Sequence, residues 1–257
     1  MIDLHTHILP GLDDGAETLE DSIRMAQVAA EDGITRLVAT PHGAEWGGGA
    51  SREDLATRVA ELRAVLAVRG VNVTVHPGLE IYLDPDLPAQ LESGSIFPLN
   101  DTRYLLVELP LQSYPRYVDQ VFFDLQLRGY HPILAHPERN NGIQKDHRLL
   151  EQLVERGVLA QVTAGSLLGA WGSMVKKTAQ VFVERRLVHI IASDAHTYEG
   201  ARAPRLSAAV RMAAKLIGED SALAMVERTP ERILAGEEVS PEPILQARGH
   251  KSWLFWR

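Results

Sequence analysis

The chain has 257 residues, with 26 Lys and Arg against 34 Asp and Glu, and a formal net charge of −8. This length suits one large domain whose hydrophobic core needs no disulfide or metal to hold it together. The chain contains no cysteine, which excludes a disulfide framework, a thiolate metal site and a cysteine nucleophile.

Short apolar runs rich in β-branched residues alternate with amphipathic stretches along the chain. The apolar runs predict strands, and apolar residues at helical spacing predict helices. Seven strands are predicted, at 2–4, 36–39, 73–79, 104–108, 132–135, 159–162 and 187–192. Helices are predicted at 19–31, 52–68, 118–127, 147–155, 174–184 and 203–216.

Strands that alternate with helices are typical of a parallel α/β sheet. Because no Gly- or Pro-rich linker interrupts the seven units, we expect residues 1–257 to form a single domain, a seven-stranded (β/α) barrel. An open doubly wound sheet is the alternative, but no glycine-rich phosphate loop follows the first strand. Residues 240–257 are expected to form a C-terminal tail, and we favour packing of its aromatic end, 253–256, onto the domain over binding to a partner.

Neither a membrane nor a nucleic acid is an expected partner. No apolar run approaches the roughly 20 residues that span a bilayer, and the first residues lack the pattern of a signal peptide. Proteins that bind nucleic acid usually present a basic face, whereas this chain carries a net charge of −8. We therefore expect a cytoplasmic protein with no membrane insertion, and the sequence is compatible with an oligomer.

Acidic residues and histidines gather where the predicted strands end, which is where α/β barrels build their active sites. His5 and His7 follow the first strand, and Asp194 and His196 follow the last. Side chains two residues apart lie on the same side of an extended segment, and barrel closure makes these two strands neighbours. The nine candidate metal ligands are His5, His7, Asp14, His42, Glu80, Glu108, His136, Asp194 and His196.

Nine ligands are too many for one catalytic ion, which also needs open positions, so two or three divalent ions are expected. Two ions would neutralise the four carboxylates of the set, and a third would leave a positive surplus that suits an anionic substrate. Imidazole and carboxylate ligands without sulfur favour Mn, Fe or Zn over Ca or Mg alone, and Co or Mg remain alternatives.

Arginines in the same loops are candidates for binding phosphate. Arg139 follows His136 by three residues, and a guanidinium there could bind two phosphate oxygens at once, which a lysine could not do. Arg202, six residues after His196, is a second candidate, with Arg205 as its alternative. The histidines at the opposite ends of strands, which we do not expect to take part, are His76, His131 and His189.

These motifs resemble the PHP (polymerase and histidinol phosphatase) superfamily and, within it, the manganese-dependent tyrosine-protein phosphatases of bacterial capsule and exopolysaccharide clusters. The segments that carry the resemblance are 3–15, 39–42, 78–81, 106–110, 134–139 and 192–196. The resemblance implies a distorted barrel, a trinuclear site and phosphate binding by Arg139 and Arg202. It implies one ion on His5, His7, Glu80 and Asp194, a second on Glu80, Glu108 and His136, and a third on Asp14, His42 and His196.

The resemblance also implies phosphomonoester hydrolysis by water activated on the metals. The implied substrate is the phosphorylated, tyrosine-rich tail of a bacterial tyrosine autokinase that controls polysaccharide synthesis. A histidinol-phosphate phosphatase and a non-catalytic phosphotyrosine-binding regulator are the alternatives, and the acidic charge counts against a nuclease. The glycine-rich segment 43–50, where relatives carry a second histidine in place of Gly43, is expected to shape the substrate entrance.

Overall fold

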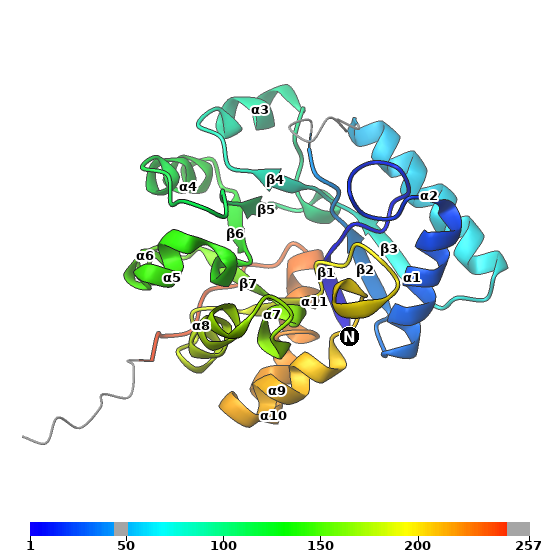
Figure 1. Cartoon of the computed structure of the whole chain (residues 1–257). Coiled ribbons are helices and arrows are strands. Elements are labelled where there is room, and N and C mark those ends of the chain that lie inside the picture. The colour runs from blue at the N-terminus through cyan, green and yellow to red at the C-terminus, as the bar shows by residue number, and fades with distance from the viewer. Residues whose placement is uncertain (44–50, 246–257) are drawn as a thin grey trace, which may run out of the picture.

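The computed structural model describes residues 1–43 and 51–245 (Figure 1). Two sequence predictions lie outside these residues, namely most of the entrance segment 43–50 and the aromatic end of the tail at 253–256. Within the described residues, the chain forms one mixed α/β domain in which most helices lie around the outside of the strands (Figure 1).

Eight strands form two parallel sheets, one of three strands in the order β1-β2-β3 and one of five in the order β4-β5-β6-β7-β8. The first sheet comprises β1 (Ile2–Thr6), β2 (Arg36–Ala39) and β3 (Thr74–Pro77). The second comprises β4 (Glu80–Tyr82), β5 (Tyr104–Glu108), β6 (His131–Ala135), β7 (Leu159–Thr163) and β8 (Ile190–Ala192).

The prediction of seven strands was wrong, because the predicted strand 73–79 ends early, as β3, and an unpredicted strand, β4, follows it in the other sheet. The chain breaks at Gly78, where a Cβ atom would come within 2.7 Å of Leu99 Cδ2 and 2.9 Å of Val38 Cγ1. Only glycine allows this close passage over β2 without displacing a neighbour. The break places Glu80 at the start of β4, where sequence alone had placed it after the end of a strand.

The two sheets meet at two isolated bridges. One joins Thr6 to Ala195, and the other joins His42 to Glu80. The backbone N–H of Glu80 also donates to the carbonyl of Pro41 at 3.2 Å. The carboxyl ends of β1, β2 and β8 are thereby brought together with the start of β4.

The strands are buried on both faces, and successive side chains enter two different apolar clusters. Leu37 and Val107 belong to an outer cluster shared with the helices. Val38 and Leu106 belong to an inner cluster between the strands, which the last helix, α11 (Arg228–Leu234), completes with two of its residues. Burial on both sides makes each strand a rigid support for the loop that follows it.

The two longest helices, α1 and α2, begin where the sequence offers capping groups. The side chain of Thr18 accepts from the N–H of Asp21, and that aspartate accepts from the N–H of Thr18, at the start of α1. A matching pair starts α2. The helices are α1 (Leu19–Glu31), α2 (Arg52–Val68), α3 (Leu87–Ser93), α4 (Val118–Leu127), α5 (Asn141–Lys145), α6 (Arg148–Glu155), α7 (Ala164–Leu168), α8 (Ser173–Glu184), α9 (Ser207–Ile217), α10 (Glu219–Ala224) and α11.

The described part of the predicted tail lies against the end of α8. The N–H of Leu245 donates to the carbonyl of Arg185 at 3.0 Å, and Glu242 pairs with Arg186 at 2.8 Å. Across residues 1–43 and 51–245, no helix has the length and apolar character needed to cross a bilayer.

Candidate metal centre

The structure brings all nine predicted ligands into one cluster at the junction of the two sheets. They come from the ends of β1, β2, β5, β6 and β8, from the first residue of β4, and from the loop before α1. Eight of them are buried, and Asp14 is the more exposed exception. Ligand atoms of eight of the nine fall into three overlapping groups, and His136 lies beside them.

The first group lies deepest and contains four fully buried side chains, His5, His7, Glu80 and Asp194. His5 Nε2 lies 3.1 Å from Glu80 Oε2 and 3.4 Å from Asp194 Oδ1. His7 Nε2 lies 3.2 Å from the same glutamate oxygen. These four residues are the set that the family resemblance assigns to one ion.

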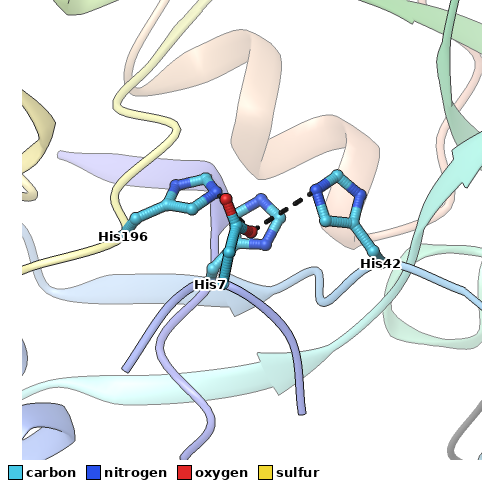
Figure 2. A group of neighbouring side chains, drawn as sticks. His7, His42 and His196 are labelled. Carbon is cyan, nitrogen blue, oxygen red and sulfur yellow. Dashed lines mark ion pairs between the residues drawn. The ribbon is translucent and has the colours of Figure 1, made fainter. Parts of the chain in front are cut away.

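The second group lies nearer the surface and combines Asp14 with three imidazoles from three separate segments, His7, His42 and His196 (Figure 2). Asp14 Oδ1 lies 3.2 Å from His196 Nε2 and 3.7 Å from His42 Nε2. The rings of His7 and His196 stack with their centroids 3.8 Å apart. His7 therefore belongs to both the first and the second group, which the resemblance did not imply.

The third group contains His42, Glu80 and Glu108. The resemblance assigns His136 to this ion in place of His42, but His136 is in none of the three groups. Its Nε2 atom still lies 3.0 Å from Glu80 Oε1 and 3.6 Å from Glu108 Oε1. The two oxygens of Glu80 thus face different imidazoles, because Oε2 faces His5, His7 and His42.

The donor set fits divalent ions. Ligand atoms about 2.0–2.2 Å from one ion lie roughly 3–4 Å from one another, and the imidazole–carboxylate contacts of the cluster measure 3.0 to 3.7 Å. Nitrogen and oxygen ligands without sulfur suit Mn, Fe and Zn. The cluster can therefore bind metal.

Two residues that the sequence predictions missed orient the deepest histidines. Asp13 Oδ2 lies 2.6 Å from His7 Nδ1, and Gln161 Oε1 lies 3.1 Å from His5 Nδ1. An oxygen at Nδ1 holds a proton there and leaves Nε2 to bind a cation. The sequence did carry a signal for each, because Asp13 adjoins a predicted ligand and Gln161 is a polar residue inside a buried strand.

The crowding of acids and imidazoles displaces their pKa values in opposite directions. Burial, reinforced by the charge of Glu80, raises the pKa of Glu108 to about 7. Burial lowers the pKa of His42 to about 4. Burial alone would lower the pKa of His5. The negative charges of Glu80 and Asp194 have the larger effect and raise this pKa to about 9. Divalent cations would replace the protons that now balance these carboxylates.

The backbone is strained at two of the predicted ligands. His136 has φ of 30° and Asp194 has φ of 52°, in the left-handed region that residues other than glycine rarely adopt. Such strain persists where surrounding structure enforces it, and it concentrates at functional sites. Both residues turn sharply out of a buried strand, which brings their side chains into the cluster.

Both predicted arginines lie beside the cluster. Arg139 Nη1 is 2.6 Å from Asp194 Oδ2, and Arg202 Nη1 is 3.7 Å from Asp14 Oδ2. Arg205 is exposed and forms no ion pair with any described residue, so the structure favours Arg202 between these two.

Sequence reasoning overlooked a tryptophan that lies next to both arginines. The Cζ atoms of Arg139 and Arg202 lie 4.8 Å and 5.9 Å from the centre of the Trp171 ring. The histidines set aside from the site stay apart from it in the structure. His76 contacts Asn100, and His189 contacts the backbone of Ala160.

Known proteins are similar to this chain in sequence and in fold. Tyrosine-protein phosphatase YwqE of Bacillus subtilis (strain 168) is 44 % identical over 198 residues, which cover 76 % of this chain and 77 % of that protein. Tyrosine-protein phosphatase CpsB of Streptococcus pneumoniae is 28 % identical over 239 residues, which cover 91 % and 98 %.

A solved structure described as one of "YwqE from Bacillus subtilis and CpsB from Streptococcus pneumoniae, unique metal-dependent tyrosine phosphatases" matches with a TM-score of 0.90 and 35 % identity. The match covers 97 % of this chain and 100 % of that one. Residues 1–235 match the family described as capsular polysaccharide synthesis, CpsB/CapC, and the chain therefore belongs to that family.

Proposed function

We propose that this protein is a metal-dependent protein-tyrosine phosphatase. The observation that carries the proposal is the buried, sulfur-free ligand cluster with Arg139 ion-paired to one of its carboxylates, Asp194. Relatives named as tyrosine-protein phosphatases support it. The substrate is the phosphorylated tyrosine-rich tail of a bacterial tyrosine kinase that controls capsule or exopolysaccharide synthesis. Because such phosphorylation consumes ATP, we place the reaction in the cytoplasm.

The proposed site holds three divalent ions, with Mn favoured. The deepest ion takes His5, His7, Glu80 and Asp194. Contacts of Glu80 Oε1 and Glu108 Oε1 with His136 support a second ion at these three residues. The cluster of Asp14, His42 and His196 supports a third. We further propose that the two sheets form a distorted barrel in a single domain, 1–257, with 240–257 as its tail.

Bound divalent ions supply a nucleophile from water at neutral pH and polarise phosphoryl oxygens. Protein side chains bind the phosphoryl group and neutralise its charge. Arg139 and Arg202 bind equatorial oxygens of the phosphoryl group and neutralise the charge that grows on them. The chain has no cysteine, so the thiol route to a covalent phosphoenzyme is closed. Tyrosine has a pKa of about 10, so its phenolate leaves without strong acid catalysis.

The test is turnover by the Mn-loaded protein of three substrates, namely p-nitrophenyl phosphate, a tyrosine-phosphorylated peptide from a tyrosine-rich kinase tail, and histidinol phosphate. We expect the phosphopeptide to have a higher kcat/KM than histidinol phosphate. The reverse preference would favour the histidinol-phosphate phosphatase. Tight binding of the phosphopeptide without turnover of any substrate would favour a non-catalytic regulator.

A further inference from the structure

Trp171 lies beside both arginines that the proposed function assigns to phosphate. Its ring centre is 4.8 Å from Cζ of Arg139 and 5.9 Å from Cζ of Arg202. The two arginines belong to short 3-10 helices, η3 (Pro137–Arg139) after β6 and η4 (Gly200–Arg202) after β8. Trp171 follows α7, which comes directly after β7. Since β7 lies between β6 and β8 in the sheet, the loop of the middle strand reaches the loops of both neighbours.

Glycines around Trp171 give the backbone the conformation that brings the ring beside both arginines. Gly169 and Gly172 flank it with φ of 98° and 92°, values that suit glycine rather than other residues. The N–H of Gly169 donates to the carbonyl of Gly165 at 2.9 Å, which closes the turn. A Cβ atom on Gly165 would lie 3.2 Å from the carbonyl oxygen of Ala201 and 3.6 Å from Trp171 Nε1. Glycine at this point therefore lets the Trp171 segment approach the segment that carries Arg202.

The ring supplies restraint that Arg202 in particular lacks. Arg139 has a close ionic partner in Asp194, but Arg202 has only a 3.7 Å contact with Asp14, and its buried Nε has no hydrogen-bond partner among the described residues. The face of an indole attracts a guanidinium, more strongly where water is partly excluded. The side chains of Arg139 and Arg202 are 16 % and 31 % exposed, so water is partly excluded here.

The Cζ atoms of both guanidinium groups lie within 5.9 Å of the centre of one ring. An aromatic ring beside both of them limits the rotamers of two long side chains, which lowers the entropy lost when phosphate binds. We propose that Trp171 is a positioning residue, whose ring holds Arg139 and Arg202 in place to bind one phosphoryl group. This inference rests on the proposed phosphatase function.

The test uses Trp171→Ala, Trp171→Phe and a matched control, Leu168→Ala. The control removes another exposed apolar side chain, 44 % accessible, from the same segment. For each Mn-loaded protein, we would measure kcat and KM on p-nitrophenyl phosphate and a phosphotyrosine peptide, the binding of inorganic phosphate by calorimetry, the metal content and the unfolding temperature.

We expect Trp171→Ala to lower kcat/KM about tenfold and to weaken phosphate binding by a similar factor, the size of a partly buried cation–π contact. Metal content should stay at the wild-type level. Trp171→Phe retains an aromatic face and should stay within about threefold of wild type. Leu168→Ala should match wild type in both measurements.

A double-mutant cycle separates positioning from other roles. In an Arg139→Ala, Arg202→Ala background, Trp171→Ala should cause little further loss. An undiminished tenfold loss in that background would overturn the inference. A fall in aryl phosphate turnover with unchanged binding of inorganic phosphate would also overturn it, because the ring would then contact the substrate itself.

The same measurements distinguish this inference from the proposed function. A wild-type protein that turns over no phosphomonoester would remove the function, while phosphate binding would still report on Trp171. An Arg139→Ala variant that is impaired alongside a Trp171→Ala variant that is normal would remove only the role of Trp171.

Discussion

Arg139 and Asp194 are joined at the edge of the ligand cluster, with Nη1 of the arginine 2.6 Å from Oδ2 of the aspartate. The other oxygen of that carboxylate, Oδ1, lies 3.4 Å from the ring nitrogens of His5 and His196. One buried carboxylate therefore faces imidazoles on one side and an arginine on the other. This link fixes the distance between the proposed phosphate-binding group and the proposed metal ligands.

Replacing Arg139 should slow the reaction without emptying the metal site. Loss of one charge contact in the transition state costs about 3 kcal/mol, so Arg139→Ala should lower kcat/KM on the order of a hundredfold. Arg139→Lys should recover only part, because an ammonium cannot replace a planar, forked donor. Steady-state kinetics on p-nitrophenyl phosphate and on phosphopeptide should show equal losses. Wild-type rates for Arg139→Ala on both substrates would exclude this residue from the mechanism.

Glu80→Ala should do more damage than Glu108→Ala. Both oxygens of Glu80 face imidazoles, at 3.0 to 3.3 Å from four rings, whereas Glu108 faces one ring at 3.6 Å. Glu80 is assigned to two of the three proposed ions. Its removal should therefore lower the number of metal ions bound per chain as well as the rate. Elemental analysis of the bound metal, together with steady-state kinetics, would check this prediction. Full metal content and a near-normal rate in Glu80→Ala would contradict its bridging role.

Removal of metal should abolish activity. Because the ligands are nitrogen and oxygen donors that suit divalent ions, we expect a chelator to stop turnover. Among added ions we expect Mn to restore it best, as the resemblance to manganese-dependent tyrosine phosphatases implies. Iodoacetamide should leave the rate unchanged, since the chain contains no thiol to alkylate. Activity that survives exhaustive chelation, with no metal detected, would refute the metal-dependent mechanism.

His189 should make the fold sensitive to acid at a point remote from the metal cluster. Burial lowers the pKa of His189 to about 4, while an unfolded histidine titrates near 6.5. Between these values the unfolded chain binds a proton that the folded chain does not, so stability falls as pH drops from about 6.5 toward 4. The expected loss at pH 5 is about 1–2 kcal/mol.

The control variant for this effect is His189→Asn. Its side-chain oxygen can accept from the Ala160 N–H, as His189 Nδ1 does at 3.1 Å, but it does not titrate. Urea unfolding at pH 7 and pH 5 should show a smaller pH-dependent loss for the variant than for wild type. Parallel losses in both proteins would show that His189 does not cause the acid sensitivity.

The residues at the strand ends allowed much of the site to be predicted, because a parallel sheet carries each of these side chains to the same edge. The pattern of His5 and His7 after the first strand, with Asp194 and His196 after the last, depends only on local spacing and on which strands are neighbours. The structure brings these residues together as that pattern anticipates. Their individual roles as ligands stay predictions.

The features that sequence reasoning missed depend on contacts between distant segments. The break at Gly78 follows from the side chains of Leu99 and Val38, which no local pattern connects to it. In the sequence, nothing distinguishes Trp171 from an ordinary exposed aromatic residue. Its role becomes visible only in the sheet order, which places its loop between the loops of Arg139 and Arg202. Periodicity shows which residues face inward, but it does not show which loops meet above the strands.

The bridge between His42 and Glu80 joins the two sheets within the described residues, and both of its residues belong to the ligand cluster. Any ion bound there holds two separately hydrogen-bonded halves of the protein to one another, so its binding free energy adds to the stability of the fold. Metal starvation in a cell would then do more than stop the reaction. It would raise the fraction of chains that open between the sheets and expose them to proteases, so the supply of metal would set the abundance of the protein as well as its activity.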